Sequence, residues 1–170
     1  MSLRLYDTRL GKKVPFEPLT PGQVGMYACG ITVYDLCHVG HARMLVAWDV
    51  IARHLRASGL AVKYVRNVTD VDDKIIRKAN AEGVSSAEIA DRYTRLMHED
   101  MQALGLAVAD HEPRATEHIA EVIDIVRLLV EADRPREHLP TLFLALAIAT
   151  FGVVNLAALV RELRRREPAR

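Results

Sequence analysis

Hydrophobic and polar positions repeat along this chain in two ways, which predict short buried strands and amphipathic helices. The clearest helix covers residues 42–58, where apolar side chains recur every three or four positions and Gly59 ends the pattern. Short apolar runs at 26–29 and 62–68 flank this helix and predict buried strands. A strand, a helix and a second strand form the unit of a parallel sheet with a right-handed crossover. We therefore predict an α/β fold.

The apolar positions of the 42–58 helix form a stripe that predicts its buried face. Trp48 lies on this stripe, and we expect it to pack in the core rather than stack on a ligand. The arginines of the segment fall off the stripe. The predicted stripe consists of Leu45, Trp48, Val50, Ile51, Ala52 and Leu55.

Serine, glycine and proline indicate where the remaining elements begin and end. Ser85 and Glu88 have the spacing of a capping box, which predicts that a helix begins after Ser85 and runs to about Leu104, before Gly105. We expect that helix to bury Ile89, Tyr93, Leu96, Met97, Met101 and Leu104. Further predicted elements are helices at 72–82 (ended by Gly83) and 116–130, a strand at 3–6, a turn at 11–13, an irregular stretch at 15–21 and a loop at 107–113.

Residues 26–43 hold the most informative pattern, because a predicted strand leads there into a predicted helix through a loop with glycine and histidine. The N–H groups and the dipole of a helix N-terminus favour anions such as phosphate. Gly40 allows a ligand close to the backbone, and His38 and His41 can share one face of the first turn. Two such histidines can also satisfy only local hydrogen bonds, and the residues alone leave both interpretations open.

The complete string is more specific than its parts. It reads Met-Tyr-Ala-Cys-Gly-Ile-Thr-Val-Tyr-Asp-Leu-Cys-His-Val-Gly-His-Ala-Arg, and it resembles the signature of cysteinyl-tRNA synthetases, a family of class I aminoacyl-tRNA synthetases. The resemblance continues through 64–74 and 112–119 and covers roughly residues 3–133. It implies the first half of a Rossmann-like (HUP-type) nucleotide-binding domain with parallel strands. It also implies ATP-dependent activation of cysteine and its transfer to tRNA-Cys.

The resemblance implies an ATP site at the His-x-Gly-His motif. His38, Gly40 and His41 would bind ATP with its Mg²⁺, and the two histidines would act in catalysis by stabilising charge that develops on the α-phosphate. Family enzymes add a second set of charges from a Lys-Met-Ser-Lys-Ser loop, and the 170 residues contain no such run. We therefore expect this chain to be inactive or weakly active alone, with a partner chain as a source of the missing half.

The resemblance also implies an amino-acid pocket and a metal ligand. Gly30, Thr32 and Thr69 would line the pocket, although turns and strand ends use the same residue types. Cys29 corresponds to one of four zinc ligands in the family, and the preference of zinc for thiolate separates cysteine from serine. The other three family ligands have no counterpart in this sequence. A makeshift zinc site from Cys29, Cys37 and the two histidines is a less favoured alternative.

Three carboxylates follow the second predicted strand, at Asp70, Asp72 and Asp73. They suggest a metal site, but a helix N-terminus also accepts carboxylates as caps, and we expect capping. Ile31 departs from the proline that is most common in the family's Cys-Gly-Pro-Thr run. The related ligases that join cysteine to an amino-sugar inositol show the same departure, and they remain an alternative function.

Composition places the protein in a broad class without pointing to chemistry. A net charge of +1 over 170 residues favours neither a nucleic-acid-coating protein nor an acidic disordered one. Half of the residues are hydrophobic, which is enough to bury a core. Two cysteines are too few for a disulfide framework and no signal peptide is visible, so we expect a cytoplasmic protein.

Composition changes near Pro135, and we divide the chain into a synthetase-like half-domain, 1–134, and an unrelated tail, 135–170. Residues 141–160 carry no charge and predict an apolar helix of roughly 30 Å, the thickness of a bilayer core. This helix could span a membrane, cover a sheet face or a partner, or be a tail appended by a coding accident. Arginines dominate the basic end after it, so a span would put the ATP-binding half outside the cell, which disfavours the membrane.

These observations leave a non-enzymatic alternative. A chain that keeps one half of a nucleotide-binding fold could bind a nucleotide or a partner without catalysis, and residues 141–160 could associate it with a membrane. The cysteine–tRNA ligase function is our first hypothesis, and the non-catalytic binding protein is the second.

Overall fold

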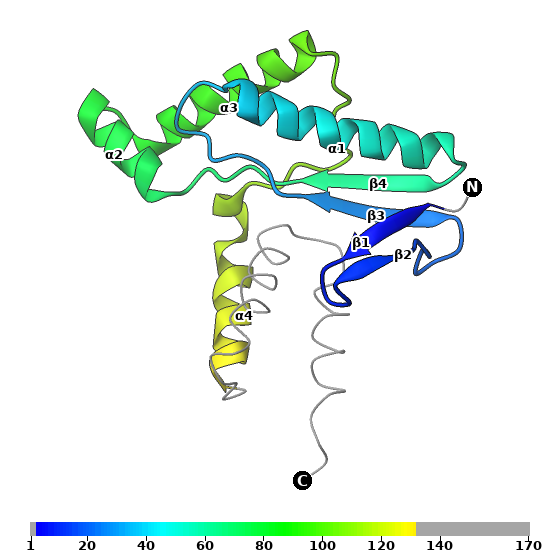
Figure 1. Cartoon of the computed structure of the whole chain (residues 1–170). Coiled ribbons are helices and arrows are strands. Elements are labelled where there is room, and N and C mark those ends of the chain that lie inside the picture. The colour runs from blue at the N-terminus through cyan, green and yellow to red at the C-terminus, as the bar shows by residue number, and fades with distance from the viewer. Residues whose placement is uncertain (1–2, 132–170) are drawn as a thin grey trace.

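The computed structural model describes residues 3–131, which form an α/β arrangement of short strands and longer helices (Figure 1). In chain order the elements are β1 Arg4–Asp7, β2 Lys12–Pro15, β3 Gln23–Ala28, α1 Val39–Ala57, β4 Ala61–Arg66, α2 Asp73–Glu82, α3 Ser86–Ala103, the 3-10 turn η1 Ala115–His118, and α4 Ile119–Glu131. The predicted strand–helix–strand unit is confirmed as β3, α1 and β4, because β3 pairs with β4 in parallel. β3 begins three residues earlier than predicted.

An antiparallel hairpin of β1 and β2 precedes the parallel sheet and corrects the turn predicted at 11–13. Asp7 pairs with Lys12, so Lys12 and Lys13 belong to a strand. Gly11 makes the turn with a φ of +63°, which glycine adopts without the penalty of a Cβ. β2 also takes Pro15 from the stretch predicted to be irregular, since a proline is tolerated in an edge strand.

A third line of chain runs beside β4, within the stretch 107–113 that was predicted to be a loop. The N–H of Arg66 donates to the carbonyl of His111 at 3.1 Å, and the N–H of Val68 donates to the carbonyl of Pro113 at 2.9 Å. Pro113 can pair in this way because only its carbonyl takes part. The loop prediction is confirmed, because no strand is assigned within 107–113, and isolated bridges connect this loop to β4 and to Val68.

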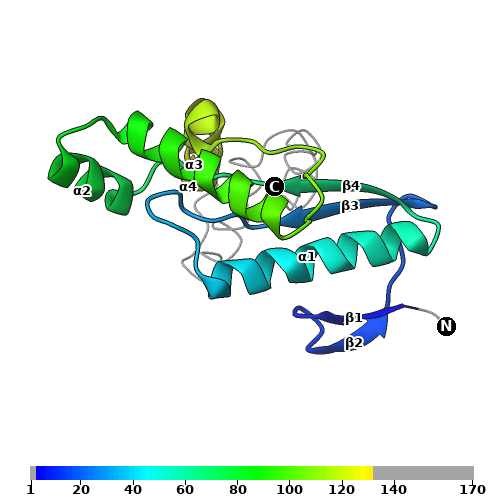
Figure 2. The ribbon, with the colours of Figure 1, turned by 90° about the horizontal axis from the view of Figure 1, so that it is seen from above.

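Helices α1 and α3 lie over one face of the parallel strands (Figures 1 and 2). Leu45, Ala52 and Leu55 of α1 are buried as predicted, whereas Val50 is 57% exposed and Ile51 is 40% exposed. The stripe predicted from apolar spacing is therefore too wide, and its outer edge faces away from the sheet.

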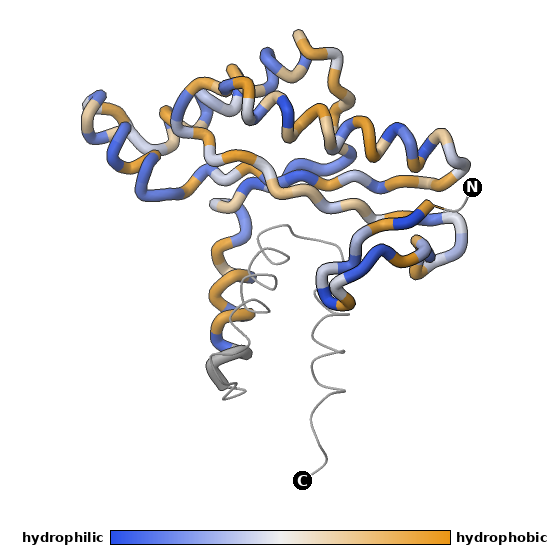
Figure 3. Tube along the Cα trace, viewed as in Figure 1, coloured by the Kyte–Doolittle hydropathy of each residue, from blue (hydrophilic) through white to orange (hydrophobic). Residues whose placement is uncertain are grey.

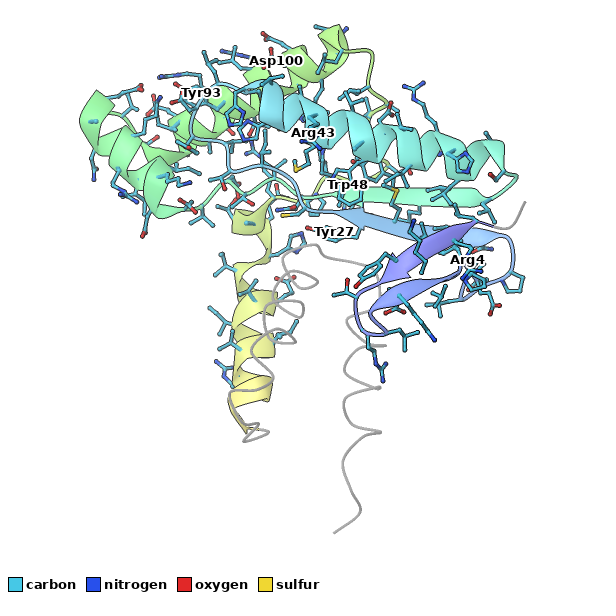
Figure 4. All side chains as sticks on the ribbon, viewed as in Figure 1. Arg4, Tyr27, Arg43, Trp48, Tyr93 and Asp100 are labelled. Atoms are coloured by element: carbon cyan, nitrogen blue, oxygen red, sulfur yellow. The ribbon has the colours of Figure 1, made fainter. Side chains whose placement is uncertain are left out.

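α1 buries the carboxylate of Asp49, whereas Ile51, which was predicted to be buried, is exposed. Asp49 is only 7% exposed, and its two oxygens accept hydrogen bonds from Nε of Arg53 at 2.7 Å and from the N–H of Ala107 at 3.1 Å. The pair ties α1 to the chain that leaves α3, so Asp49 is buried with its partners satisfied. Trp48 lies between α1 and the strands, half buried against the core, as predicted (Figure 4).

Helices α2 and α3 begin and end as their capping residues predicted. Asp72 is the N-cap of α2, and Gly83 ends that helix with a φ of +69°. Ser85 and Glu88 form the predicted capping box of α3. The buried face of α3 contains Ile89, Tyr93, Met97 and Met101. Leu104 is 48% exposed, contrary to prediction, because the helix ends just before it.

The helix predicted at 116–130 begins with the tighter turn η1 before it continues as α4. α4 projects from the face of the sheet opposite α1, and the part of it that Figure 3 colours alternates between apolar and polar positions (Figures 1 and 3). In residues 3–131 no helix is both long enough and apolar enough to cross a membrane. The apolar helix predicted at 141–160 lies outside the described residues.

Candidate functional site

The carboxyl ends of β3 and β4 lie beside each other, near the start of α1 (Figure 1). Ligands of open parallel sheets bind in the crevice beyond these ends. The predicted site residues come from the segment 29–32 after β3, from the first turn of α1 and from Thr69 after β4. Thr32 and Thr69 are joined directly as a parallel bridge, so the structure brings the predicted amino-acid pocket residues together.

One extra residue after β3 makes Gly30 approach the backbone of Asn67. Between the pair Ala28–Arg66 and the threonine bridge, the β3 side takes four steps where the β4 side takes three. A Cβ placed on Gly30 would lie 1.7 Å from the carbonyl oxygen of Asn67, a distance that no side chain can occupy. The position therefore requires glycine because two backbones approach closely there.

Asn67 connects the predicted pocket residues, although no role was predicted for it. Its side-chain oxygen accepts the N–H of Gly30 at 2.6 Å and the hydroxyl of Tyr27 at 2.9 Å. Its side-chain nitrogen donates to Oγ1 of Thr69 at 3.0 Å. Tyr27 lies on the sheet face opposite Trp48 (Figure 4).

The His-x-Gly-His motif begins at the N-cap of α1 and continues into its first turn, rather than lying ahead of the helix. His38 is the N-cap: its Nδ1 accepts the N–H of Gly40 at 3.1 Å, while Nδ1 of His41 accepts the N–H of His38 at 3.3 Å. The two rings stack with centroids 3.9 Å apart at an interplanar angle of 23°. A Cβ on Gly40 would lie 2.8 Å from Cε1 of His38, so glycine keeps the stacked pair in place. The histidines thus satisfy local hydrogen bonds through one nitrogen each.

The remaining nitrogen of each ring is a donor. Backbone N–H groups only donate, so both Nδ1 atoms are acceptors and the neutral rings carry their protons on Nε2. Burial, with a further contribution from His38, lowers the pKa of His41 and favours its neutral form. No acidic residue lies in the first turn of α1. Two Nε2–H groups at a helix N-terminus are suited to an anion.

Cys29 follows β3 with an exposed thiol. The pKa of Tyr27 is raised mainly by its burial and to a smaller extent by the nearby Cys29. Cys37 is half buried, and burial together with Asp100 raises the pKa of its thiol. Among residues 3–131 no three His, Cys, Asp or Glu side chains gather closely enough to hold a metal ion. The described residues do not fit a complete zinc site, and the makeshift site of two cysteines and two histidines is not formed there.

Asp70, Asp72 and Asp73 occupy three separate environments rather than one cluster. Asp72 caps α2 by accepting the N–H of Lys74 at 2.8 Å, as predicted. Asp70 is buried and accepts both the N–H of Thr116 at 2.9 Å and its hydroxyl at 2.6 Å. Asp73 is exposed in the first turn of α2. Capping of α2 is confirmed for Asp72, whereas Asp70 anchors η1.

A buried ion pair beside the site was also missed by the sequence analysis. Arg66 is 2% exposed and pairs with Glu112, whose second oxygen lies 2.7 Å from Nε2 of His98 on α3. These contacts tie the end of β4 to the third line of chain and to α3. Arg66 and Glu112 are 46 positions apart, and no local spacing pattern connects such residues.

Comparison with known proteins assigns the family. The family of class I tRNA synthetase (C) catalytic domains matches residues 15–138. This chain belongs to that family. The Cysteine--tRNA ligase of Geobacter metallireducens is 56% identical over 131 residues, which cover 77% of this chain and 27% of the relative. The Cysteine--tRNA ligase of Salmonella arizonae is 54% identical over 129 residues, which cover 76% of this chain and 28% of the relative. The chain thus spans roughly a quarter of the length of these relatives.

Solved structures of two other synthetases share the fold. Mycobacterium tuberculosis methionyl-tRNA synthetase, in complex with methionyl-adenylate, matches 64% of this chain and 22% of its own with a TM-score of 0.57 and 26% identity. The Agrobacterium radiobacter K84 LeuRS–tRNA–LeuAMS complex matches 68% of this chain and 16% of its own with a TM-score of 0.55 and 20% identity. The predicted fold class, the first part of a class I synthetase nucleotide-binding domain, is confirmed.

Proposed function

We propose that this chain carries the ATP- and cysteine-binding part of a cysteine–tRNA ligase, which activates cysteine with ATP and transfers it to tRNA-Cys. The observation that supports this most is the stacked pair of His38 and His41, which presents two Nε2–H donors at the N-terminus of α1. Relatives named Cysteine--tRNA ligase, at 56% and 54% identity, add to it. A cytoplasmic location goes with this function.

His38, Gly40 and His41 are the proposed ATP-binding residues. A carboxylate oxygen of cysteine attacks the α-phosphorus of Mg²⁺-bound ATP, the bond to the bridging oxygen breaks, and pyrophosphate leaves with the electron pair. The two Nε2–H groups donate to α-phosphate oxygens, whose negative charge grows in the transition state. Gly40 leaves the backbone open to the phosphates. The protein forms no covalent bond in this step, and its contribution is position and charge.

Gly30, Thr32 and Thr69 are the proposed amino-acid-binding residues. The bridge between the two threonines and the close approach at Gly30 place all three where β3 and β4 end. Cys29 is proposed as one ligand of the zinc ion of the family, which when bound would supply a soft partner for the thiol of the substrate. Because the described residues do not complete that site, no step of activation is assigned to the metal.

The 170-residue chain by itself is proposed to catalyse cysteine-dependent ATP–pyrophosphate exchange weakly or not at all. It contains no Lys-Met-Ser-Lys-Ser run, and loss of one set of preorganised donors costs about 10²–10³ in rate. Binding without exchange would fit a partner chain that supplies further charges, and it is also what a non-catalytic nucleotide-binding protein would show. Exchange that the histidine variants below abolish would contradict the proposed inactivity.

The binding proposal is tested by calorimetric titration with a non-hydrolysable sulfamoyl analogue of cysteinyl-adenylate (the adenylate analogue). His38→Asn and His41→Asn keep an acceptor near the position of Nδ1 and remove the outer donor. We expect each variant to weaken binding by about tenfold, the size of one hydrogen bond to a charged group. His54→Asn makes the same change at an exposed position in the last turn of α1 and should bind like the wild type. Equal affinity in all four proteins, or no binding, would reject the proposal.

A further inference from the structure

Asn67 is a buried polar residue at the centre of the proposed amino-acid pocket, and the proposed mechanism gives it no role. It is 3% exposed, yet three hydrogen bonds satisfy its side chain. The oxygen accepts from Gly30 at 2.6 Å and from Tyr27 at 2.9 Å, and the nitrogen donates to Oγ1 of Thr69 at 3.0 Å. A buried amide whose oxygen and nitrogen both have partners holds one orientation, because turning it over would leave a buried donor or acceptor unpaired.

The orientation of the Asn67 amide follows from chemistry. The backbone N–H of Gly30 can only donate, so the atom that faces it must be the side-chain oxygen. The –NH₂ group then faces Thr69, and an –NH₂ group can only donate as well. Oγ1 of Thr69 is therefore an acceptor in this bond, and its own proton is not used by Asn67.

Thr69 is half buried, and within residues 3–131 its hydroxyl donates to no other group, so that proton is open to a ligand. We propose that Asn67 is a positioning residue of the amino-acid pocket, which fixes the Thr69 hydroxyl as a hydrogen-bond donor to an acceptor atom of the bound amino acid. This inference rests on the proposed function, since it assigns the pocket to an amino acid. The acceptor is a carboxylate or carbonyl oxygen or the sulfur of the substrate, because an ammonium group offers only donors.

Replacement of Asn67 by aspartate reverses the direction of this bond with almost no change in shape. An aspartate oxygen still accepts from Gly30 and Tyr27, so the contacts that hold the strand ends remain. Its second oxygen is also an acceptor, and Thr69 must then donate its proton to it. The ligand loses the donor while the hydroxyl stays in place.

The test is calorimetric titration of the 170-residue chain with the adenylate analogue, using Asn67→Asp, Thr69→Val and the double variant. Thr69→Val removes the hydroxyl and keeps the shape of the side chain. We expect each single variant to bind about tenfold more weakly, and the double variant to bind no more weakly than either, because both remove the same donor. Thr94→Val is the matched control: Thr94 is also buried and lies on α3, and its hydroxyl has no hydrogen-bond partner within residues 3–131, so affinity should not change.

The outcomes separate this inference from the proposed function. If the wild-type chain does not bind the analogue, the proposed function fails and the inference fails with it. If the wild type binds and the two substitutions weaken binding additively, the carboxylate introduced by Asn67→Asp acts through its charge and the inference alone is overturned. Wild-type affinity in either single variant also overturns it.

A second readout does not depend on an Asn67 variant that folds. In the ¹⁵N-labelled wild type the side-chain NH₂ signal of Asn67 reports the bond to Thr69. Thr69→Val should shift this signal, while Thr69→Ser, which restores a hydroxyl, should retain both the signal and the affinity. An Asn67 signal that is unchanged in Thr69→Val would overturn the inference.

Discussion

His38 and His41 stack 3.9 Å apart while each ring uses Nδ1 to accept a backbone N–H of the same helix turn. The pair therefore acts as the cap of α1 and as a source of two outward donors. A cap made of serine or aspartate would satisfy the helix equally well but would offer an anion no N–H group. This difference explains why histidines at a helix start are informative about phosphate binding.

The first prediction concerns protonation of this pair. Burial and, to a smaller extent, His38 lower the pKa of His41 below 6.5, so His38→Asn should raise it part of the way back. In the unfolded chain His41 takes up its proton near pH 6.5, whereas in the folded chain it stays neutral to lower pH. The contribution of His41 to the free energy of unfolding is thus complete above that pH and is lost as the pH falls through the lowered pKa.

NMR titration of the ring protons measures this pKa, and chemical unfolding between pH 8 and pH 5 measures the stability. His41→Asn should remove the part of the pH dependence that belongs to this residue. An ordinary or raised pKa for His41 would show that burial and the neighbouring ring do not act as described.

The second prediction concerns the close approach after β3. Gly30→Ala places a methyl group 1.7 Å from a backbone oxygen, so the strand ends must move apart. We expect a loss of about 2–3 kcal/mol in the free energy of unfolding, together with weaker binding of the adenylate analogue. Gly25→Ala in β3 is the control, because no described residue apart from its chain neighbours lies within 4 Å of a Cβ there and the change should alter stability little. Urea unfolding measures the free energy of unfolding of both variants. An equal loss in the two would show that the backbones do not approach closely at Gly30.

The third prediction distinguishes the carboxylates after β4. Asp70→Ala leaves the N–H and hydroxyl of Thr116 without their acceptor, and we expect a loss of about 2 kcal/mol in the free energy of unfolding. Asp73→Ala changes an exposed carboxylate and should cost no more than about 0.5 kcal/mol through the helix dipole. Thermal unfolding of both variants measures the difference. A larger loss for Asp73→Ala than for Asp70→Ala would contradict this prediction.

Local signals in the sequence predicted the fold where neighbouring residues determine structure. The caps at Asp72 and Ser85 and the stop at Gly83 depend on residues within one helix turn, and all three were predicted correctly. The residues Gly30 and Thr69 were recognised because they stand in a string that resembles a known family. Their proximity followed from the rule that parallel strands end at one edge of the sheet.

Interactions between distant segments were not predictable in this way. Asp49 was not among the residues predicted to be buried, and one of its partners, the N–H of Ala107, lies far along the chain. The pairing of Arg66 with His111 likewise depends on a segment without strand pattern. The contacts of Asn67 were not predicted, because only one of its three partners, Thr69, is close to it in sequence.

The proposed binding site is tested most directly by locating the bound adenylate analogue on the 170-residue chain by two-dimensional ¹H–¹⁵N NMR. We predict that the largest shifts fall on the amides of Gly40 and His41, in the first turn of α1, and on those of Gly30 and Thr69. Shifts concentrated instead around the pocket lined by Phe16, Leu19 and Arg56, among other residues, would contradict it, because that pocket lies at the amino ends of β3 and β4.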